Sequence, residues 1–320
     1  MGDAGTDGRF AKLLVHVDPR QSDDPAVRCA VALAHRWQAS LTLFDVQSDL
    51  SWPLQYLAGG WETLIENVGG EKHKALQDRA ASLAGQVLSV SAVMGRGRLA
   101  SAIISQVKQT GIDLVIKVAE GHGPDRSGFL GSTDHRLLRD CPCPILILHP
   151  ESVGPFQRVA VALDVMDEHE LQIELDRLVL QVAREISEGE LRLIYAMPRM
   201  VDIVVVDPDD TDLICENQLD EWDHELRTVA AAKLDALERT CPARASSQVL
   251  LGAPEQALPD FVETQHCDLL VMGTAARSGL EGMLVGNTAE RIFDQLQCSV
   301  LALKLPASKS RIGPSESEEA

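Results

Sequence analysis

Two short glycine-bearing segments are the residues best suited to chemistry in this sequence. They are Gly131-Ser132 and Gly286-Asn287-Thr288, and each opens a predicted helix. Glycine lets backbone N–H groups approach a phosphate closely, and a helix N-terminus adds unpaired donors and a favourable dipole. An aspartate, Asp18 or Asp164, closes the first apolar run of each half of the chain. Its carboxylate could accept a hydrogen bond from a base or a ribose, so together these residue types indicate nucleotide binding.

A purely structural interpretation competes with this one. Asn287-Thr-Ala-Glu290 has the spacing of a capping box, which needs no ligand, and glycine is common where a strand turns into a helix. Short glycine patterns also occur by chance. On spacing alone, both interpretations stay open.

The segments are repeated because the chain contains a duplication. Residues 10–18 match residues 156–164 at an offset of 146, and Asp113-Leu-Val-Ile matches Asp268-Leu-Leu-Val at an offset of 155. The difference between the offsets implies a net insertion of nine residues in the second copy. Two copies of one unit therefore account for the length of 320 residues, with the join at residues 150–155.

Each copy alternates short apolar runs with amphipathic segments, which predicts two doubly wound α/β domains with parallel five-stranded sheets. The expected strands are 12–17, 41–46, 86–93, 114–118, 145–148, 158–163, 191–195, 246–251, 269–272 and 300–303. The expected helices are 24–37, 71–83, 100–109, 168–186, 219–238 and 256–264, with further helices starting at Ser132 and Asn287. The domains are expected at 10–150 and 156–305, with disordered ends at 1–9 and 306–320.

The insertion in the second copy falls at residues 198–211. Its apolar run 201–206 is expected to form an extra strand or hairpin that covers a sheet edge. A short apolar run between acidic residues is more often such local cover than a binding element.

The charge balance argues against nucleic acid as a partner. The chain has 48 acidic and 29 basic residues, a net charge of -19, and most of the excess lies after residue 150; phosphate binding by a nucleic-acid protein needs clustered Lys and Arg. No apolar run reaches the ~18 residues of a membrane span, and residues 1–9 lack a signal-peptide core. We therefore expect a cytoplasmic protein with reduced cysteines, in which Cys141-Pro-Cys143 packs structurally.

Other common chemistries lack their motifs. The sequence has no Gly-x-Gly-x-x-Gly after a first strand, no phosphate-binding P-loop and no Gly-x-Ser-x-Gly elbow. Its nine histidines never take metal-site spacing. We therefore assign no catalytic residue and no metal ligand.

Residues 268–291 and 298–304, together with residues 113–117 and 133–144, resemble the universal stress protein family, and the duplicated layout is similar to its tandem, UspE-type members. The resemblance covers residues 10–305. It implies a Rossmann-like fold, related to the adenine nucleotide alpha hydrolases, in each copy. Members of the family pair through their last strand, so residues 145–148 and 300–303 are expected to pair within one chain as a pseudo-dimer, which could dimerise further.

The resemblance also implies a site for ATP or AMP. The family pattern Gly-x2-Gly-x9-Gly-Ser/Thr falls on Gly273, Ala276, Gly286 and Asn287, with Thr288 one step later, and on Val118, Gly121, Gly131 and Ser132 in the first copy. The family's base-side contacts fall on Asp164 and Ala196, or on Asp18 and Val46. Ala276 and Val118 replace glycines of the pattern, so each copy departs from it once or more.

The resemblance implies a cytoplasmic stress-response factor that binds a small molecule and does not turn it over. Two alternatives remain beside adenine nucleotide binding. One is a regulator with an apolar or lipid-like ligand and no ATP, suggested by the aromatic residues Phe44, Trp52, Tyr56 and Trp61 after the second strand. The other is a slow ATPase, for which Asp164 is the one candidate base.

Overall fold

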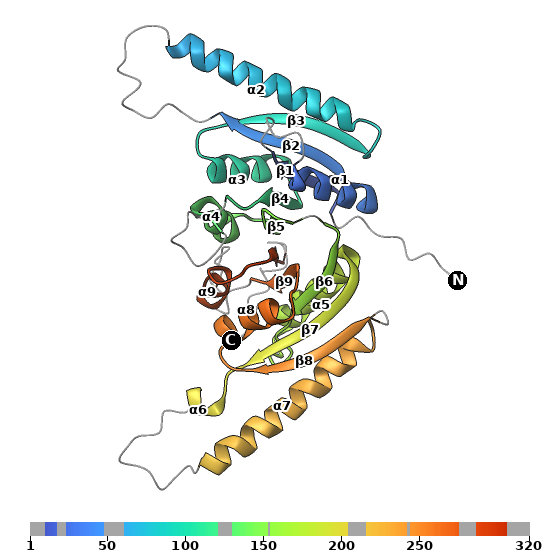
Figure 1. Ribbon diagram of the computed structural model, residues 1–320, viewed down its shortest axis with the longest axis vertical. Coiled ribbons are helices and arrows are strands. Elements are labelled where there is room, and N and C mark those ends of the chain that lie inside the picture. Colours follow the sequence, from blue (N-terminus) through green and yellow to red (C-terminus); the bar gives the residue numbers. More distant parts are fainter. Residues whose placement is uncertain are drawn as a thin grey trace, which may run out of the picture. The chain divides into compact units, whose positions relative to one another are not determined.

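The computed structural model describes residues 10–17, 24–47, 61–120, 130–152, 154–203, 216–241, 244–274 and 286–305. The described residues up to Gly154 belong to one compact unit, and those from Pro155 belong to a second. Both units follow the same plan, in which apolar strands alternate with helices (Figure 1).

The first unit begins with the buried strand that the sequence predicts. Its strands are β1 (Lys12–His16), β2 (Ser40–Gln47), β3 (Ser89–Arg96), β4 (Leu114–Val118) and β5 (Ile145–Leu148). Its helices are α1 (Pro25–Trp37), α2 (Trp61–Leu83), α3 (Leu99–Thr110) and α4 (Ser132–Asp140). Local residue chemistry sets the helix ends: the Asp24 side chain accepts from the Ala26 N–H at 2.8 Å and starts α1. Gly111, with φ of 65°, ends α3.

The second unit repeats this order. Its strands are β6 (Phe156–Ala162), β7 (Ser187–Met197), β8 (Ala245–Leu251), β9 (Leu269–Gly273) and β10 (Ser299–Leu303). Its helices are α5 (Glu170–Ile186), α6 (Met200–Ile203), α7 (Glu216–Glu238), α8 (Pro254–Thr264) and α9 (Asn287–Phe293). The helix α6 has no counterpart in the described part of the first unit.

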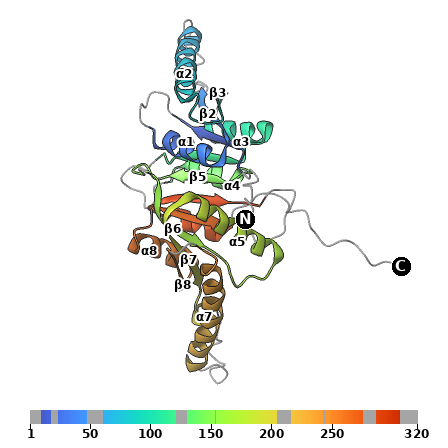
Figure 2. The ribbon, with the colours of Figure 1, turned by 90° about the vertical axis from the view of Figure 1, so that its right-hand side faces the viewer.

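The strands of each unit are all parallel, and their order is that of the first five strands of the dinucleotide-binding fold. The order is β3-β2-β1-β4-β5 in the first unit and β10-β9-β6-β7-β8 in the second. Figure 2 shows α1 and α3 on opposite sides of the first unit's strands. The order reverses between β1 and β4, and between β6 and β9. In open parallel sheets a ligand sits beyond the carboxyl ends of the strands at this reversal.

One hydrogen-bond arrangement recurs in both units and fixes the start of the first strand. Asp113, just before β4, accepts from the backbone N–H groups of Ala11 and Lys12 at 3.0 and 2.9 Å. Asp268, just before β9, accepts from those of Gln157 and Arg158 at 2.7 and 3.1 Å. The duplication seen in the sequence therefore extends to individual contacts.

The predicted fold class is confirmed, with shifts at some element ends. The expected strand 86–93 begins three residues later, as β3, because Gly85 turns with φ of 87° and Leu88 is 69% exposed. Helix α2 begins at Trp61, ten residues before the expected start, so its first turns include residues that the periodicity did not assign. The pairing of the two copies through residues 145–148 and 300–303 stays a prediction.

The expected extra strand or hairpin at 201–206 is wrong where the structure can test it. Residues 201–203 belong to helix α6, and residues 204–206 lie outside the described part. The Met200 N–H donates to Asp223 of α7 at 2.8 Å, and Asp202 pairs with Arg199 at 3.2 Å. These polar contacts favour a helical turn over extension. In the parts of the chain that the structure describes, no helix is long and apolar enough to cross a membrane.

Gly189 gives a stability test of the second sheet. It lies where the pairing of β6 with β7 shifts register, and a Cβ at this position would be 2.1 Å from the carbonyl oxygen of Gln157. We expect Gly189→Ala to lower the free energy of unfolding by about 1–3 kcal/mol. Gly70→Ala is the control, since no described atom lies within 4 Å of a Cβ there and alanine in a helix interior stabilises by about 0.5–1 kcal/mol.

Urea denaturation followed by circular dichroism measures both substitutions. The expected result is a lower midpoint for Gly189→Ala and an equal or higher one for Gly70→Ala. An unchanged midpoint for Gly189→Ala would contradict the described register shift.

Candidate functional site

The reversal point of the second unit brings three strands together at their carboxyl ends. Ala162, the last residue of β6, pairs with Met272 of β9 on one side and with Ile194 of β7 on the other. The Leu163 N–H continues the ladder to the Ile194 carbonyl at 3.0 Å. Whatever follows these strands therefore shares one edge of the sheet, which is the place where such folds bind ligands.

The predicted residues of the second copy that the structure describes lie at or just beyond this edge. Asp164 follows β6 and is half-buried, and Ala196 is buried near the end of β7. Gly273 ends β9, and Gly286 precedes α9, whose first residues Asn287 and Thr288 are exposed. Ala276 lies outside the described residues.

A second carboxylate lies against Asp164. The backbone N–H of Asp164 donates to Asp176 of α5 at 3.1 Å, and the Gln172 side chain donates to the same carboxylate at 2.8 Å. Burial raises the pKa of Asp176 to about 7, with the charges of Asp164 and Asp167 adding to the rise and the two hydrogen bonds opposing it. Asp176 therefore exchanges a proton near neutral pH.

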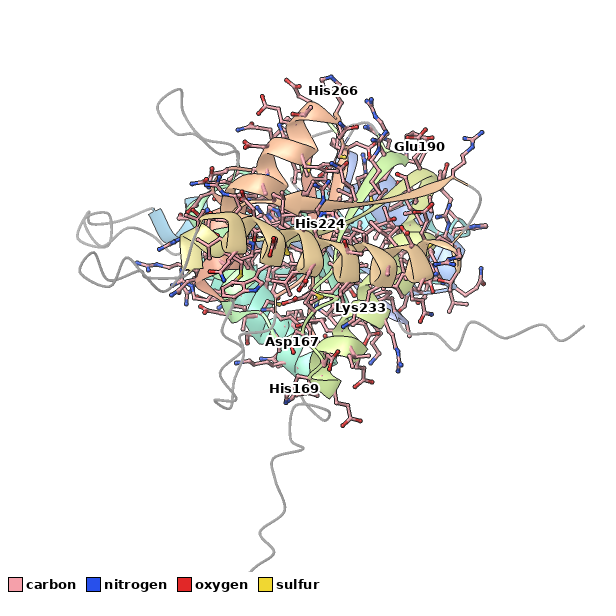
Figure 3. All side chains as sticks on the ribbon, turned by 90° about the horizontal axis from the view of Figure 1, so that it is seen from below. Asp167, His169, Glu190, His224, Lys233 and His266 are labelled. Carbon is pink, nitrogen blue, oxygen red and sulfur yellow. The ribbon has the colours of Figure 1, made fainter. Side chains whose placement is uncertain are left out.

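The segment that follows Asp164 is held by its own polar contacts. The Asp167 side chain accepts from the His169 N–H at 2.9 Å, and the His169 ring accepts from the Leu171 N–H at 3.3 Å. Lys233 of α7 donates to Glu168 at 3.0 Å, and Figure 3 shows Lys233 near Asp167 and His169. The segment after Asp164 is therefore held by hydrogen bonds to α5 and α7.

The two described glycines of the second copy differ in their surroundings. A Cβ at Gly273 would be 2.5 Å from Cδ2 and 2.7 Å from Cγ of Leu175, so close packing against α5 requires glycine there. At Gly286 no described atom lies within 4 Å of such a Cβ, and φ is −65°, which any residue adopts. Neither conformation nor described packing explains Gly286.

The capping box expected at Asn287–Glu290 is wrong. The residue at the N-cap is Gly286, and no side-chain hydrogen bond caps the helix there. The helix starts one residue too early for Asn287 to act as the cap, because Asn287 itself is already helical. The purely structural explanation of this segment thus loses its main support.

At the corresponding edge of the first unit, two charged side chains form a buried ion pair. Lys117 of β4 donates to Asp134 of α4, and both side chains are fully buried. The other carboxylate oxygen of Asp134 accepts from the backbone N–H groups of Gly131 at 2.7 Å and Glu120 at 3.1 Å. The sequence signal for this pair is a lysine inside the apolar run 114–118 and an aspartate three residues after Gly131.

Three further titratable side chains, those of His16, Asp45 and Lys72, lie near this ion pair. Nε2 of His16 lies 3.8 Å from Asp45 of β2, and Lys72 of α2 donates to the same carboxylate at 3.0 Å. Burial, together with the nearby positive charge of Lys117, lowers the pKa of His16 to about 4. His16 is therefore neutral at pH 7.

The second unit has no such charges at the matching positions. At the offset of 155, Met272 replaces Lys117 and Ala289 replaces Asp134, and both are buried. Among the predicted first-copy residues, Val46 and Gly131 are buried and Ser132 is exposed. Asp18 and Gly121 lie outside the described residues.

The structure describes only part of the aromatic cluster that suggested an apolar ligand, so that alternative stays a prediction. Phe44 is buried against Gly95, while Trp52, Tyr56 and the side chain of Trp61 lie outside the described residues. The described His, Cys, Asp and Glu residues form no group of three or more that could hold a metal ion.

The described cysteines form no disulfide, and Sγ of Cys141 lies 3.7 Å from Sγ of Cys143. Both of these side chains are buried, which is consistent with a packing role. Burial raises the pKa of Cys29 to about 12 and that of Cys267 to about 11. The pKa of Cys298 is raised too, by burial and by the neighbouring Cys267.

The sequence model of the universal stress protein family matches the chain twice, over residues 9–149 and 155–304. The chain belongs to the universal stress protein family. It is 28% identical to universal stress protein E of Photorhabdus laumondii over 307 residues, 92% of this chain and 95% of that protein. It is therefore a tandem universal stress protein of the stress response, as the resemblance implied.

Solved structures agree on the fold. The crystal structure of a Pseudomonas aeruginosa protein of unknown function matches with a TM-score of 0.70 and 24% identity, covering 94% of each chain. A universal stress protein crystallised in complex with cAMP matches 47% of this chain and 99% of its own, with 19% identity and a TM-score of 0.31.

The contrast between Gly273 and Gly286 can be measured. Gly273→Ser is expected to lower the free energy of unfolding by about 1–3 kcal/mol, because the new side chain meets Leu175. Gly286→Ser is expected to change it by less than about 0.5 kcal/mol, because the site has space and serine is a good N-cap residue. Denaturant unfolding of both variants tests this, and equal losses would contradict the described packing.

Asp176 makes stability depend on pH in a defined direction. Its pKa is raised in the folded state, so the folded protein holds this proton between about pH 4 and pH 7 while the unfolded chain releases it. The stabilisation is present below pH 4 and is lost as the pH rises through 7. Asp176→Asn keeps an acceptor but cannot ionise, so the stability of this variant relative to the native chain should rise from pH 5 to pH 8. A constant difference across that range would contradict the raised pKa.

Proposed function

We propose that this tandem universal stress protein is a cytoplasmic factor that acts by binding an adenine nucleotide at the carboxyl edge of its second unit, without turnover. The proposal keeps the expectation that the two copies pair through their last strands. It places the phosphate end of the ligand at Gly286, Asn287 and Thr288 and the base and ribose end at Asp164 and Ala196.

The observation that carries the proposal is the open glycine at position 286. A side chain there would meet no described atom, and no side chain occupies the N-cap of the helix that follows. A ligand that approaches the backbone N–H groups would require such space. Ligand binding would therefore explain why glycine stands at position 286, where the described packing does not require it.

The other described residues fit the same ligand. Asn287 and Thr288 are exposed polar side chains beside Gly286, able to donate to phosphate oxygens. Asp164 is half-buried and follows β6 at the reversal point, so its carboxylate can accept from a ribose hydroxyl or a base amino group. These groups bind and orient the ligand.

A slow ATPase is the enzymatic alternative. It would need a general base near the phosphate end, whereas Asp164 follows β6 and fits the base and ribose end instead. The other carboxylate on this side, Asp176, accepts hydrogen bonds from Gln172 and from the Asp164 N–H. In this proposal Asp164 contacts the base and ribose, and no described carboxylate is assigned as a general base.

Equilibrium dialysis with labelled ATP and with labelled AMP tests the proposal. The native chain should bind saturably, with a Kd below about 1 mM, and Gly286→Val should weaken binding by at least about tenfold by blocking the backbone donors. Gly70→Ala, in the other unit, should bind like the native chain.

Absence of saturable binding below about 1 mM by the folded native chain would overturn nucleotide binding. Phosphate release from ATP is measured alongside. Release that exceeds background, and that Asp164→Asn abolishes, would favour the ATPase instead.

A further inference from the structure

The buried ion pair of the first unit lies at the start of α4, the helix that the residues matching the ATP-binding pattern open. Gly131 and Ser132 match the last glycine and the hydroxyl residue of the ATP-binding pattern. Asp134 lies in the first turn of the helix that these residues open, and its carboxylate turns back onto the Gly131 N–H at 2.7 Å. This is the bond that the N3 carboxylate makes in a capping box, and it uses a donor that is also suited to a ligand phosphate.

The donors around Asp134 have the make-up of an oxyanion site. One carboxylate oxygen accepts from two backbone N–H groups, those of Gly131 and Glu120, and the other accepts from the Lys117 ammonium. Converging backbone N–H groups with one cation are the usual means by which proteins hold phosphate. Asp134 and Lys117 are both fully buried, so water does not share these bonds.

The approach to the donors is also filled. A Cβ at Gly131 would lie 3.1 Å from Cβ of Glu120 and 3.4 Å from an Asp134 oxygen. At Gly286 of the second unit the same construction meets no described atom within 4 Å. The matching side chains there, Met272 and Ala289, bring neither an anion nor a cation to the site.

We propose that Asp134 is a built-in anion that occupies the phosphate position of the first unit, with Lys117 as its counter-ion, and so closes that unit to nucleotides. Removing the carboxylate turns the same donors into a site for a small oxyanion such as phosphate. The native chain then has at most one nucleotide site, in the second unit, and this consequence alone rests on the proposed function.

An ordinary structural ion pair would give a different result on mutation. Asp134→Ala leaves a buried, unpaired lysine and should destabilise the protein under either interpretation. Only an oxyanion site predicts that added phosphate reverses the loss. Asp134→Ala combined with Lys117→Met copies the pair of the second unit, so it should restore stability and remove the response to phosphate.

The experiment compares thermal unfolding of the full native chain, Asp134→Ala and the double variant in sodium phosphate and in sodium chloride of equal ionic strength. Saturating phosphate is expected to raise the Tm of Asp134→Ala by about 5 °C and to leave the other two proteins unchanged. Sodium formate, which matches the missing carboxylate, is the reference for refilling the vacated space.

Three results would overturn the proposal: a Tm of Asp134→Ala that phosphate does not change, a response to formate but not to phosphate, or an equal response in the double variant. If Asp134→Ala does not fold in chloride, the yield of refolded protein is measured against phosphate concentration instead. Recovery with phosphate supports the proposal, and no recovery overturns it. Because ATP is absent throughout, the outcome does not depend on whether the second unit binds nucleotide.

Discussion

In each unit the hydrogen-bonded ladder between the first and fourth strands decides which side chains can meet at the carboxyl edge. The pairing of Ala162 with Met272 places the residues after β6 and β9 side by side, and Asp268 holds the start of β6 in that register. In the first unit Asp113 performs the same task for β1. The site residues described above depend on this pairing, because those on the strands lie near the carboxyl ends and the others follow the strands or begin the helices.

The two units share this strand pairing and differ in the side chains at the carboxyl edge of the sheet. The first unit has a buried lysine, a buried aspartate and a neutral histidine in one row, while the second has alanine and methionine at the matching positions and carboxylates beyond them. A buried ion pair stabilises little by itself, since desolvation offsets most of the attraction. Its presence in only one unit is explained, in our proposal, by the ligand phosphate that it excludes.

The alternation of apolar runs and amphipathic segments was enough to predict the parallel α/β fold and nearly all of its elements. It failed at 201–203, where an apolar run forms helix α6 through polar contacts to Asp223 and Arg199 that periodicity cannot show. The sequence pattern also could not distinguish the two glycines. A Cβ at Gly273 would meet the side chain of Leu175, whereas a Cβ at Gly286 would meet no described atom. The Lys117–Asp134 pair joins residues 17 positions apart, and their contact depends on how β4 and α4 pack, which the order of residues alone does not reveal.

The shared aspartates have a consequence for the history of the chain. Because Asp113 and Asp268 make the same pair of bonds to the first strand of their own copy, that arrangement was already present in the single-domain ancestor. The Lys117–Asp134 pair is found in one copy alone, so the two copies have diverged at these positions. The ancestor therefore already had the hydrogen bonds that fix the first strand, and the two copies later came to differ in a few side chains at the edge of the sheet.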